Sequence, residues 1–259
     1  MAMESAGYPV PMTILVVDAE SFSLLPNSEQ LAARRLLYAV LSESLESAGV
    51  PWQYCRHEDR GDGAVVLIPP EIPKPVVLRG LLAGFGDRLA EVTRRHGLPS
   101  LRIRAALHAG EVHFDQHGIA GSDLNHAFRL ADCPELKQAL RLSRVGFALI
   151  VSDALYRSTV LHRYDGLDPA RFFQVQVRVK EADAIGWLST PGDEDCAERV
   201  AGHPRPVPAL ARPGDGGLRL QAGRDLSIDG ANVAGRDITV SGPATTREST
   251  KRGTRKRRI

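Results

Sequence analysis

The sequence predicts an α/β or α+β sandwich, a domain in which helices pack on a central β-sheet. Short apolar runs such as residues 13–17 and 147–152 alternate along the chain with segments of helical periodicity. The alternation ends near residue 189, and residues 190–217 are rich in Pro, Gly and charged side chains, which is typical of a linker. With 259 residues, of which 43% are hydrophobic, the chain can bury one good core and still have residues to spare.

The spacing of apolar residues predicts the individual elements. Residues 13–17 are expected to form a strand, and regularly spaced leucines from Ser28 to Ala48 predict a helix. Residues 63–69 form a short predicted strand that is stopped by prolines, and residues 76–97 a second amphipathic helix closed by a glycine. The remaining predicted elements are, in chain order, a strand at 101–114, a helix around 123–141, a strand at 147–152 and a closing pair of strands near 172–189.

Composition narrows the cellular setting. The three cysteines, Cys55, Cys133 and Cys196, are scattered and odd in number, which favours reduced thiols over a disulfide or zinc framework. No apolar run approaches the ~20 residues that a membrane span needs. The N-terminus lacks the basic-then-apolar pattern of a signal peptide. We therefore expect a cytoplasmic protein with no membrane partner.

The net charge of +2 is distributed unevenly along the chain. The last 13 residues, from Arg247, hold seven Lys or Arg against one Glu, so the chain before them carries about −4. The sequence thus predicts a mildly acidic globular body and a basic, disordered tail over residues 244–259. A nucleic-acid partner is expected through this tail only.

A twelve-residue repeat lies between the linker and the basic tail. AGRDLSIDG at 222–230 recurs as AGRDITVSG at 234–242, and each copy reads as a turn, a short strand and a turn. Two such strands cannot bury a face alone, so residues 218–243 are predicted to stack on copies from other chains or on a downstream effector. The repeat resembles bacterial amyloid-like signalling motifs. A disordered tail with a chance duplication is the alternative.

Two carboxylates lie at the ends of predicted strands. Asp18 follows the apolar run at 14–17, and Asp62 lies between two glycines just before the strand at 63–69, as in a tight hairpin. Taken alone, Asp18 is more often the N-cap of the next helix. Two adjacent strand ends that each present a carboxylate would hold one or two divalent ions such as Mg²⁺ or Mn²⁺. Such a pair fits phosphoryl chemistry.

Asn125 and Arg129 form a second polar group, on the helix predicted around residues 123–141. Their spacing of four residues puts both side chains on one helical face. An Asn that orients a sugar and an Arg that binds a phosphate would suit a nucleotide. An exposed polar face without function is the alternative for these two residues taken alone.

The order and spacing of these motifs resemble the class III nucleotidyl cyclases, which include adenylyl and guanylyl cyclases. The resemblance covers about residues 12–189 and implies a ferredoxin-like fold with a central, mostly antiparallel sheet and helices packed on it. The matching segments are VVDAESFS (16–23, first metal motif), GDG (61–63, second metal site), RIRAALHAGEV (102–112, strand before the dimerisation arm), GSDLNHAFRL (121–130, transition-state motif) and VQVRVKE (175–181, closing strand).

The resemblance implies a role for each matching residue. Asp18 and Asp62 would hold two Mg²⁺ or Mn²⁺ ions, with the carbonyl of Ala19 as a further ligand. Asn125 would position the ribose, and Arg129 would stabilise charge on the transferred phosphoryl group. Asn125 and Arg129 would be the catalytic residues.

The resemblance also implies substrate-binding residues. Lys180 matches a phosphate-contacting lysine, although Glu181 and the following Ala depart from the family's Gly-Lys segment. Glu58 falls at a base-selecting position, as in guanylyl cyclases, where a carboxylate accepts hydrogen bonds from guanine. The second base-selecting position falls on Gly118 or Ile119, which offer no side-chain hydrogen bond. GTP is therefore the expected substrate, and the gap leaves room for a pyrimidine nucleotide.

The resemblance implies an enzyme that converts a nucleoside triphosphate to a 3′,5′-cyclic nucleotide and pyrophosphate for intracellular signalling. In the family the carboxylates come from one subunit and the Asn and Arg from the other, so a homodimer with composite active sites is expected. The alternative is a catalytically inactive nucleotide-sensing or assembly protein, whose repeat tail drives oligomerisation.

Overall fold

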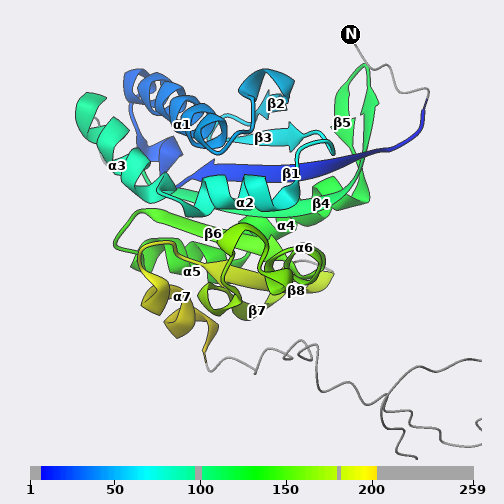
Figure 1. Ribbon diagram of the computed structural model, residues 1–259. Coiled ribbons are helices and arrows are strands. Elements are labelled where there is room, and N and C mark those ends of the chain that lie inside the picture. The colour runs from blue at the N-terminus through cyan, green and yellow to red at the C-terminus, as the bar shows by residue number, and fades with distance from the viewer. Residues whose placement is uncertain (1–6, 97–100, 180–181, 203–259) are drawn as a thin grey trace, which may run out of the picture. The chain divides into compact units, whose positions relative to one another are not determined.

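A computed structural model describes residues 7–96, 101–179 and 182–202. Within these residues the chain forms one sheet of eight strands with helices on both faces (Figure 1). The strands are β1 (Val10–Ala19), β2 (Arg56–Asp59), β3 (Gly63–Ile68), β4 (Ile103–Asp115), β5 (Gly118–Ala120), β6 (Phe147–Ser152), β7 (Phe173–Val179) and β8 (Ala182–Ser189). The α-helices are α1 (Asn27–Ser47), α2 (Lys74–Leu82), α3 (Phe85–His96), α4 (Ser122–Asp132), α5 (Pro134–Leu142), α6 (Asp153–Ser158) and α7 (Glu194–Ala201). Short 3₁₀ helices cover Phe22–Leu24, Trp52–Tyr54, Val160–His162, Tyr164–Gly166 and Pro169–Arg171.

The strands lie in the order β2-β3-β1-β4-β6-β8-β7, and β5 pairs with the end of β4. β4 and β6 are parallel, and the other pairs of described strands are antiparallel. The prediction of a mostly antiparallel sheet with helices packed on it is therefore confirmed. Parallel neighbours need a long crossover, and here the connection from β4 to β6 contains α4 and α5.

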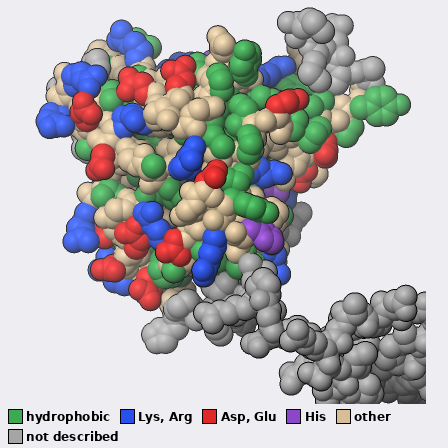
Figure 2. Space-filling view, viewed as in Figure 1, with side chains coloured by type: hydrophobic (Ala, Val, Ile, Leu, Met, Phe, Trp, Pro, Cys, Tyr) green, Lys and Arg blue, Asp and Glu red, His purple; other side chains and the backbone are tan. Residues whose placement is uncertain are grey.

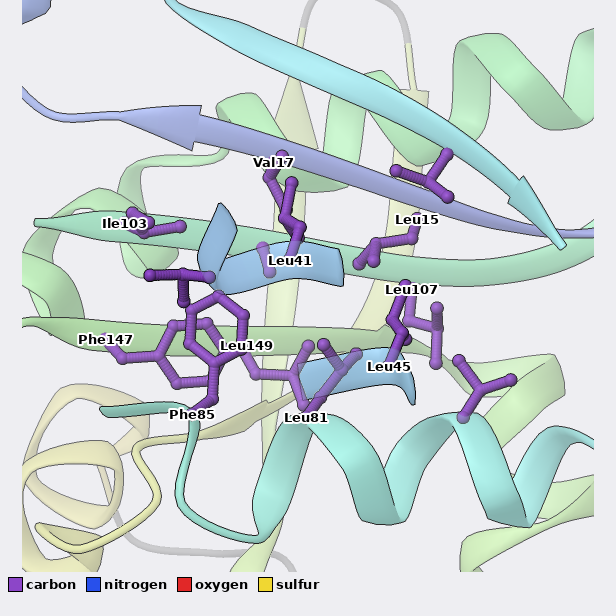
Figure 3. Close-up of a cluster of buried hydrophobic side chains, with 14 of the residues drawn as sticks. Leu15, Val17, Leu41, Leu45, Leu81, Phe85, Ile103, Leu107, Phe147 and Leu149 are labelled. Carbon is purple, nitrogen blue, oxygen red and sulfur yellow. The ribbon is translucent and has the colours of Figure 1, made fainter. Parts of the chain in front are cut away.

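The middle of the sheet is buried on both faces. Successive residues of β1 point to opposite sides, so Leu15 and Val17 join one core while Ile14 and Val16 join the other. The first core lies under α1, α2, α3 and α6, and the second under α4, α5 and α7. The first core, shown in Figure 3, includes Leu15, Val17, Leu41, Leu45, Leu81, Phe85, Ile103, Leu107, Phe147 and Leu149.

Most of the predicted elements are confirmed, and two predicted helices are wrong because each is broken. The helix expected over 76–97 is interrupted at Gly84, whose φ of +83° is left-handed, so α2 and α3 are separate helices. The helix expected around 123–141 is interrupted before Pro134. Cys133 has an extended backbone there, as the residue before a proline usually does.

The folded unit continues past the predicted start of the linker at residue 190. Residues 194–201 form α7, whose Cys196 and Ala197 are fully buried. Asp193, just before the helix, accepts a hydrogen bond from the backbone N–H of Arg144 at 2.9 Å. The rest of the predicted linker, the repeat at 218–243 and the basic tail at 244–259 lie outside the described residues.

The surface of the folded unit mixes charges of both signs. On the face that Figure 2 shows, Lys and Arg side chains are interspersed with Asp and Glu, and they do not form one continuous basic surface. None of the helices in the described part of the chain is long and apolar enough to cross a membrane.

We predict that Gly63→Ala destabilises the protein, because a Cβ at this position would lie 2.1 Å from the carbonyl oxygen of Val17. Overpacking of this kind typically lowers the free energy of unfolding by about 1–3 kcal/mol. Gly86→Ala in α3 is the matched control, since its Cβ would lie at an ordinary 3.5 Å from Val145. Denaturant unfolding should show a loss of stability for the first variant and an equal or slightly higher stability for the second. Equal stabilities of Gly63→Ala and the unmodified protein would contradict this prediction.

Candidate active site

The two predicted metal carboxylates lie side by side at the end of the β1–β3 pair. Asp18 pairs with Gly63 in the antiparallel register, and the Ala19 N–H donates to the carbonyl of Asp62 at 2.9 Å. Only a residue without a Cβ fits at position 63, where the backbone of Val17 passes so close. The glycine therefore lets the start of β3 approach β1 closely enough to bring Asp62 next to Asp18.

Asp18 lies within β1 and is not a helix cap. The helical segments that follow it begin after Ser21 and Pro26, so the N-cap alternative for Asp18 is wrong. Oδ1 of Asp18 forms an ion pair with Nη2 of Arg104 on β4, at a distance of 2.9 Å. Burial raises the pKa of Asp18 to about 6; Arg104 opposes this increase, and the neighbouring Asp62 adds to it.

A cavity of about 530 Å³ opens where these carboxylates meet helix α4. Asn125 and Arg129 are both exposed on one face of α4 and both line this cavity, as do Asp18 and Asp62. The structure thus brings four of the sequence-predicted residues around one space within a single chain. The complete lining is Val16, Val17, Asp18, Arg60, Asp62, Gly63, Arg104, Asn125, Phe128, Arg129, Ala131 and Asp132.

A hydrogen-bonded link that sequence reasoning missed fixes the start of α4. Asp123 accepts a bond from the backbone N–H of Glu111 at 2.7 Å and lies 3.3 Å from Nε2 of the buried His108. Nδ1 of His108 in turn lies 2.8 Å from the hydroxyl of Ser152. Because Asp123 is two residues before Asn125, this link sets the position of α4 against β4 and β6.

The pKa values of this pair follow its packing. Burial lowers the pKa of His108, although Asp123 opposes the decrease. Partial burial would raise the pKa of Asp123, but the bonds from Glu111 and His108 together lower it. The pair is therefore an ionised carboxylate beside a neutral imidazole near neutral pH. The sequence held a signal for Asp123 alone, because an acidic residue in the first turn, here after Gly-Ser, is typical of helix starts.

The carboxylate pair fits a divalent cation. The two neighbouring carboxylates are hard oxygen ligands of the kind that Mg²⁺ and Mn²⁺ prefer. The predicted third ligand, the carbonyl of Ala19, belongs to a residue that does not line the cavity. Asp62 raises the pKa of Asp18, and a cation between the two would remove that repulsion. In the described part of the chain no three His, Cys, Asp or Glu side chains group as metal ligands, so the remaining ligands would come from phosphate and water.

The predicted substrate-binding residues either do not line the cavity or lie outside the described residues. A Cβ on Gly118 would lie 3.3 Å from Oε1 of Glu58, so the two predicted base-selecting positions are neighbours. Ile119 packs partly buried against the second core. Glu58, Gly118 and Ile119 are not among the residues that line the cavity. Lys180 lies outside the described residues.

Comparison with known proteins identifies the fold. No protein-family model and no curated protein sequence matches the chain. The crystal structure of the guanylyl cyclase Cya2 matches with a TM-score of 0.50 at 19% identity, over 70% of this chain and 92% of that one. The adenylate/guanylate cyclase/hydrolase from Silicibacter pomeroyi matches with a TM-score of 0.50 at 21% identity, over 71% and 98%. The chain has the fold of class III nucleotidyl cyclase catalytic domains, which confirms the predicted fold.

We predict that ionised Asp18 destabilises the metal-free protein. The pKa of Asp18 is 3.8 in its ordinary state and about 6 in the folded protein. Between these values the native state holds more protons on Asp18 than the unfolded chain does. The free energy of unfolding therefore falls as pH rises through this window, and the loss is complete above it.

Thermal unfolding of Asp18→Asn beside the unmodified protein, both in EDTA, measures this effect from pH 4 to pH 8. The variant's melting temperature relative to the unmodified protein should rise between about pH 4 and pH 6 and stay constant above. Arg104 pairs only with ionised Asp18, and its effect is already part of the pKa of about 6, so it adds no separate pH dependence. A difference in melting temperature that is independent of pH would contradict the prediction.

Proposed function

We propose that the protein is a nucleotide cyclase, which converts a nucleoside triphosphate to a 3′,5′-cyclic nucleotide and pyrophosphate. The observation that supports this most is the single cavity lined by Asp18, Asp62, Asn125 and Arg129. A cation-binding carboxylate pair facing an amide and a guanidinium is suited to hold a triphosphate together with its ribose. The cyclase fold is consistent with this chemistry, although fold alone does not define an activity.

In the proposed reaction the ribose 3′-oxygen forms a bond to the α-phosphorus, while the bond from that phosphorus to the bridging oxygen of the β-phosphate breaks. The proton of the 3′-hydroxyl is released, and pyrophosphate leaves. Asp18, Asp62 and the Ala19 carbonyl would hold Mg²⁺ or Mn²⁺, which when bound lowers the pKa of the attacking hydroxyl and offsets phosphate charge. Asn125 would orient the ribose by hydrogen bonding.

Two guanidinium groups complete the charge balance of the proposed site. Arg129 would stabilise the charge that builds on the transferred phosphoryl group. Arg104 also lines the cavity and holds Asp18 at 2.9 Å, so a triphosphate entering beside Asp18 would meet its positive charge. Lys180 would add a phosphate contact.

GTP is the favoured substrate in this proposal. The sequence resemblance places a carboxylate, Glu58, at a base-selecting position, as in guanylyl cyclases, and Gly118 and Ile119 offer no side-chain contact to the base. Glu58 does not line the cavity, so its effect on base choice would act through a neighbouring residue. A pyrimidine nucleotide is the second candidate.

A direct test measures pyrophosphate release from each of the four nucleoside triphosphates with Mn²⁺ present. Turnover of at least one triphosphate, with formation of its cyclic nucleotide, is expected. Binding of nucleotide without turnover would contradict the enzyme and favour an inactive nucleotide sensor instead.

We predict that Asp62→Asn lowers kcat by at least about a hundredfold, because a metal ligand of this kind supplies several kcal/mol of transition-state stabilisation. Asp62 is exposed, so the variant should keep its unfolding transition. Asp59→Asn is the matched control in the same hairpin. Asp59 pairs with Arg34 at 2.5 Å and does not line the cavity, so its turnover should be unchanged. Equal effects of the two substitutions would contradict the assignment of Asp62.

We further propose that the protein acts as a homodimer with composite sites, in which the carboxylates of one chain would serve the same substrate as Asn125 and Arg129 of the other. The cavity of one chain also holds all four residues, so complementation decides between the two arrangements. Asp18→Ala chains and Arg129→Ala chains should each be inactive, and a mixture should regain part of the activity, since a heterodimer keeps one intact site. Initial rates of the mixture, with subunit exchange shown independently, are the measurement. No recovery despite exchange would mean that the cavity of one chain forms the whole site.

A further inference from the structure

The carboxylate of Glu58, predicted to read the base, is held by two arginines of the same hairpin. Its Oε2 lies 3.1 Å from Nη2 of Arg60, and its Oε1 lies 3.6 Å from Nη2 of Arg56. Oε1 also faces the space above Gly118, where a Cβ would be 3.3 Å away. One acceptor of Glu58, Oε2, is therefore bonded to Arg60, and Glu58 is not part of the cavity wall.

Arg60, unlike Glu58, lines the cavity. Its guanidinium carbon lies 5.3 Å from the centre of the Phe128 ring, within the range of a cation–π contact. Phe128 is on α4 between Asn125 and Arg129, so this contact places Arg60 beside the residues proposed to bind ribose and phosphate. Glu58 on one side and Phe128 on the other limit the positions that the Arg60 side chain can take.

A guanidinium so held can only donate hydrogen bonds. It has five N–H donors in a planar fork and no acceptor, and the bond to Glu58 uses one of them. A planar fork matches a base edge with two adjacent acceptors. Guanine offers O6 and N7, which is the commonest specific contact of Arg in base recognition, and cytosine offers O2 and N3. Adenine replaces one acceptor by an amino donor, and uracil separates its two oxygens by an N–H.

We propose that Arg60 reads the base, and that Glu58 acts as a positioning residue that holds Arg60. This rests on the proposed cyclase function and specifies its substrate: a nucleotide whose base presents two adjacent acceptors, with GTP first and CTP second. ATP and UTP are excluded from efficient use.

The test is Arg60→Gln, because the amide of glutamine pairs with N6 and N7 of adenine. The ratio of kcat/KM for GTP to kcat/KM for ATP should favour GTP in the unmodified protein and fall by at least about tenfold in the variant. Arg56→Gln is the matched control. Arg56 also contacts Glu58, but its guanidinium lies over the Phe114 ring at 4.7 Å and it does not line the cavity. Its ratio should stay unchanged.

Binding measurements separate the two proposals. The 3′-deoxy triphosphates lack the attacking hydroxyl, so their affinity reports base recognition without turnover. In one outcome the unmodified protein cyclises a nucleotide while Arg60→Gln leaves the GTP-to-ATP ratio unchanged, both in kcat/KM and in the affinity for the 3′-deoxy triphosphates. That result, or an equal change in Arg56→Gln, overturns the role of Arg60 and leaves the cyclase function in place. A preference for ATP or UTP in the unmodified protein also overturns it, whereas a preference for CTP supports it with cytosine as the base. Failure to bind or cyclise any triphosphate overturns both proposals.

Discussion

The pairing of β1 with both β3 and β4 is the constraint on which the cavity depends. Asp18 stands opposite Gly63 on one side and opposite Arg104 on the other, so the two registers decide what surrounds this carboxylate. A slip of one residue would turn Asp18 to the other face of the sheet and put an apolar side chain in its place. That slip is prevented by burial, because Leu15 and Val17 fit one core and Ile14 and Val16 the other. The site is therefore positioned by the packing of its apolar neighbours.

The negative charge of the two carboxylates lowers the stability of the fold and favours the binding of a cation. Asp18 is partly buried next to Asp62, and Arg104 only partly compensates for the loss of solvation. Partly buried charges with shifted pKa values are typical of functional sites, because positions with a purely structural role seldom retain them. A bound cation would supply the missing positive charge. Binding of a cation to the folded protein would therefore raise its free energy of unfolding.

Sequence reasoning predicted the parts of the site that depend on local geometry. Asp62 was found because a glycine-flanked Asp before an apolar run is a hairpin signal, and Asn125 and Arg129 were found because a spacing of four defines a helical face. Gly84 and Pro134 are local signals too, and they show where the two over-long predicted helices break. The broad class of fold followed from the alternation of strands and helices.

Residues that depend on distant partners could not be found in this way. The link from Asp123 to His108 spans 15 residues of sequence, and nothing local to either residue indicates that they meet. The position of Arg60 depends on α4, which approaches it only in the folded chain. One part was open to prediction: Arg56 and Glu58 lie two apart on an edge strand, and side chains at that spacing share one face of a sheet. That alternation predicts that the carboxylate of Glu58 has a basic neighbour.

The crossover between β4 and β6 has a consequence for the order in which the protein folds. The carboxylate pair depends on β1 and β3, and β3 ends at Ile68, so every strand that the pair needs lies in the first part of the chain. Helix α4 belongs to a later segment, and its place is fixed only when β6 adds in parallel beside β4. Both pairings join residues that are far apart in sequence, so neither is favoured by a short loop, and in a newly made chain the order follows the order of synthesis. A newly made chain would thus contain its carboxylate pair before helix α4, which lines the other side of the cavity. A ligand that contacts both the carboxylate pair and helix α4 would therefore stabilise the contact between an early and a later segment of the domain.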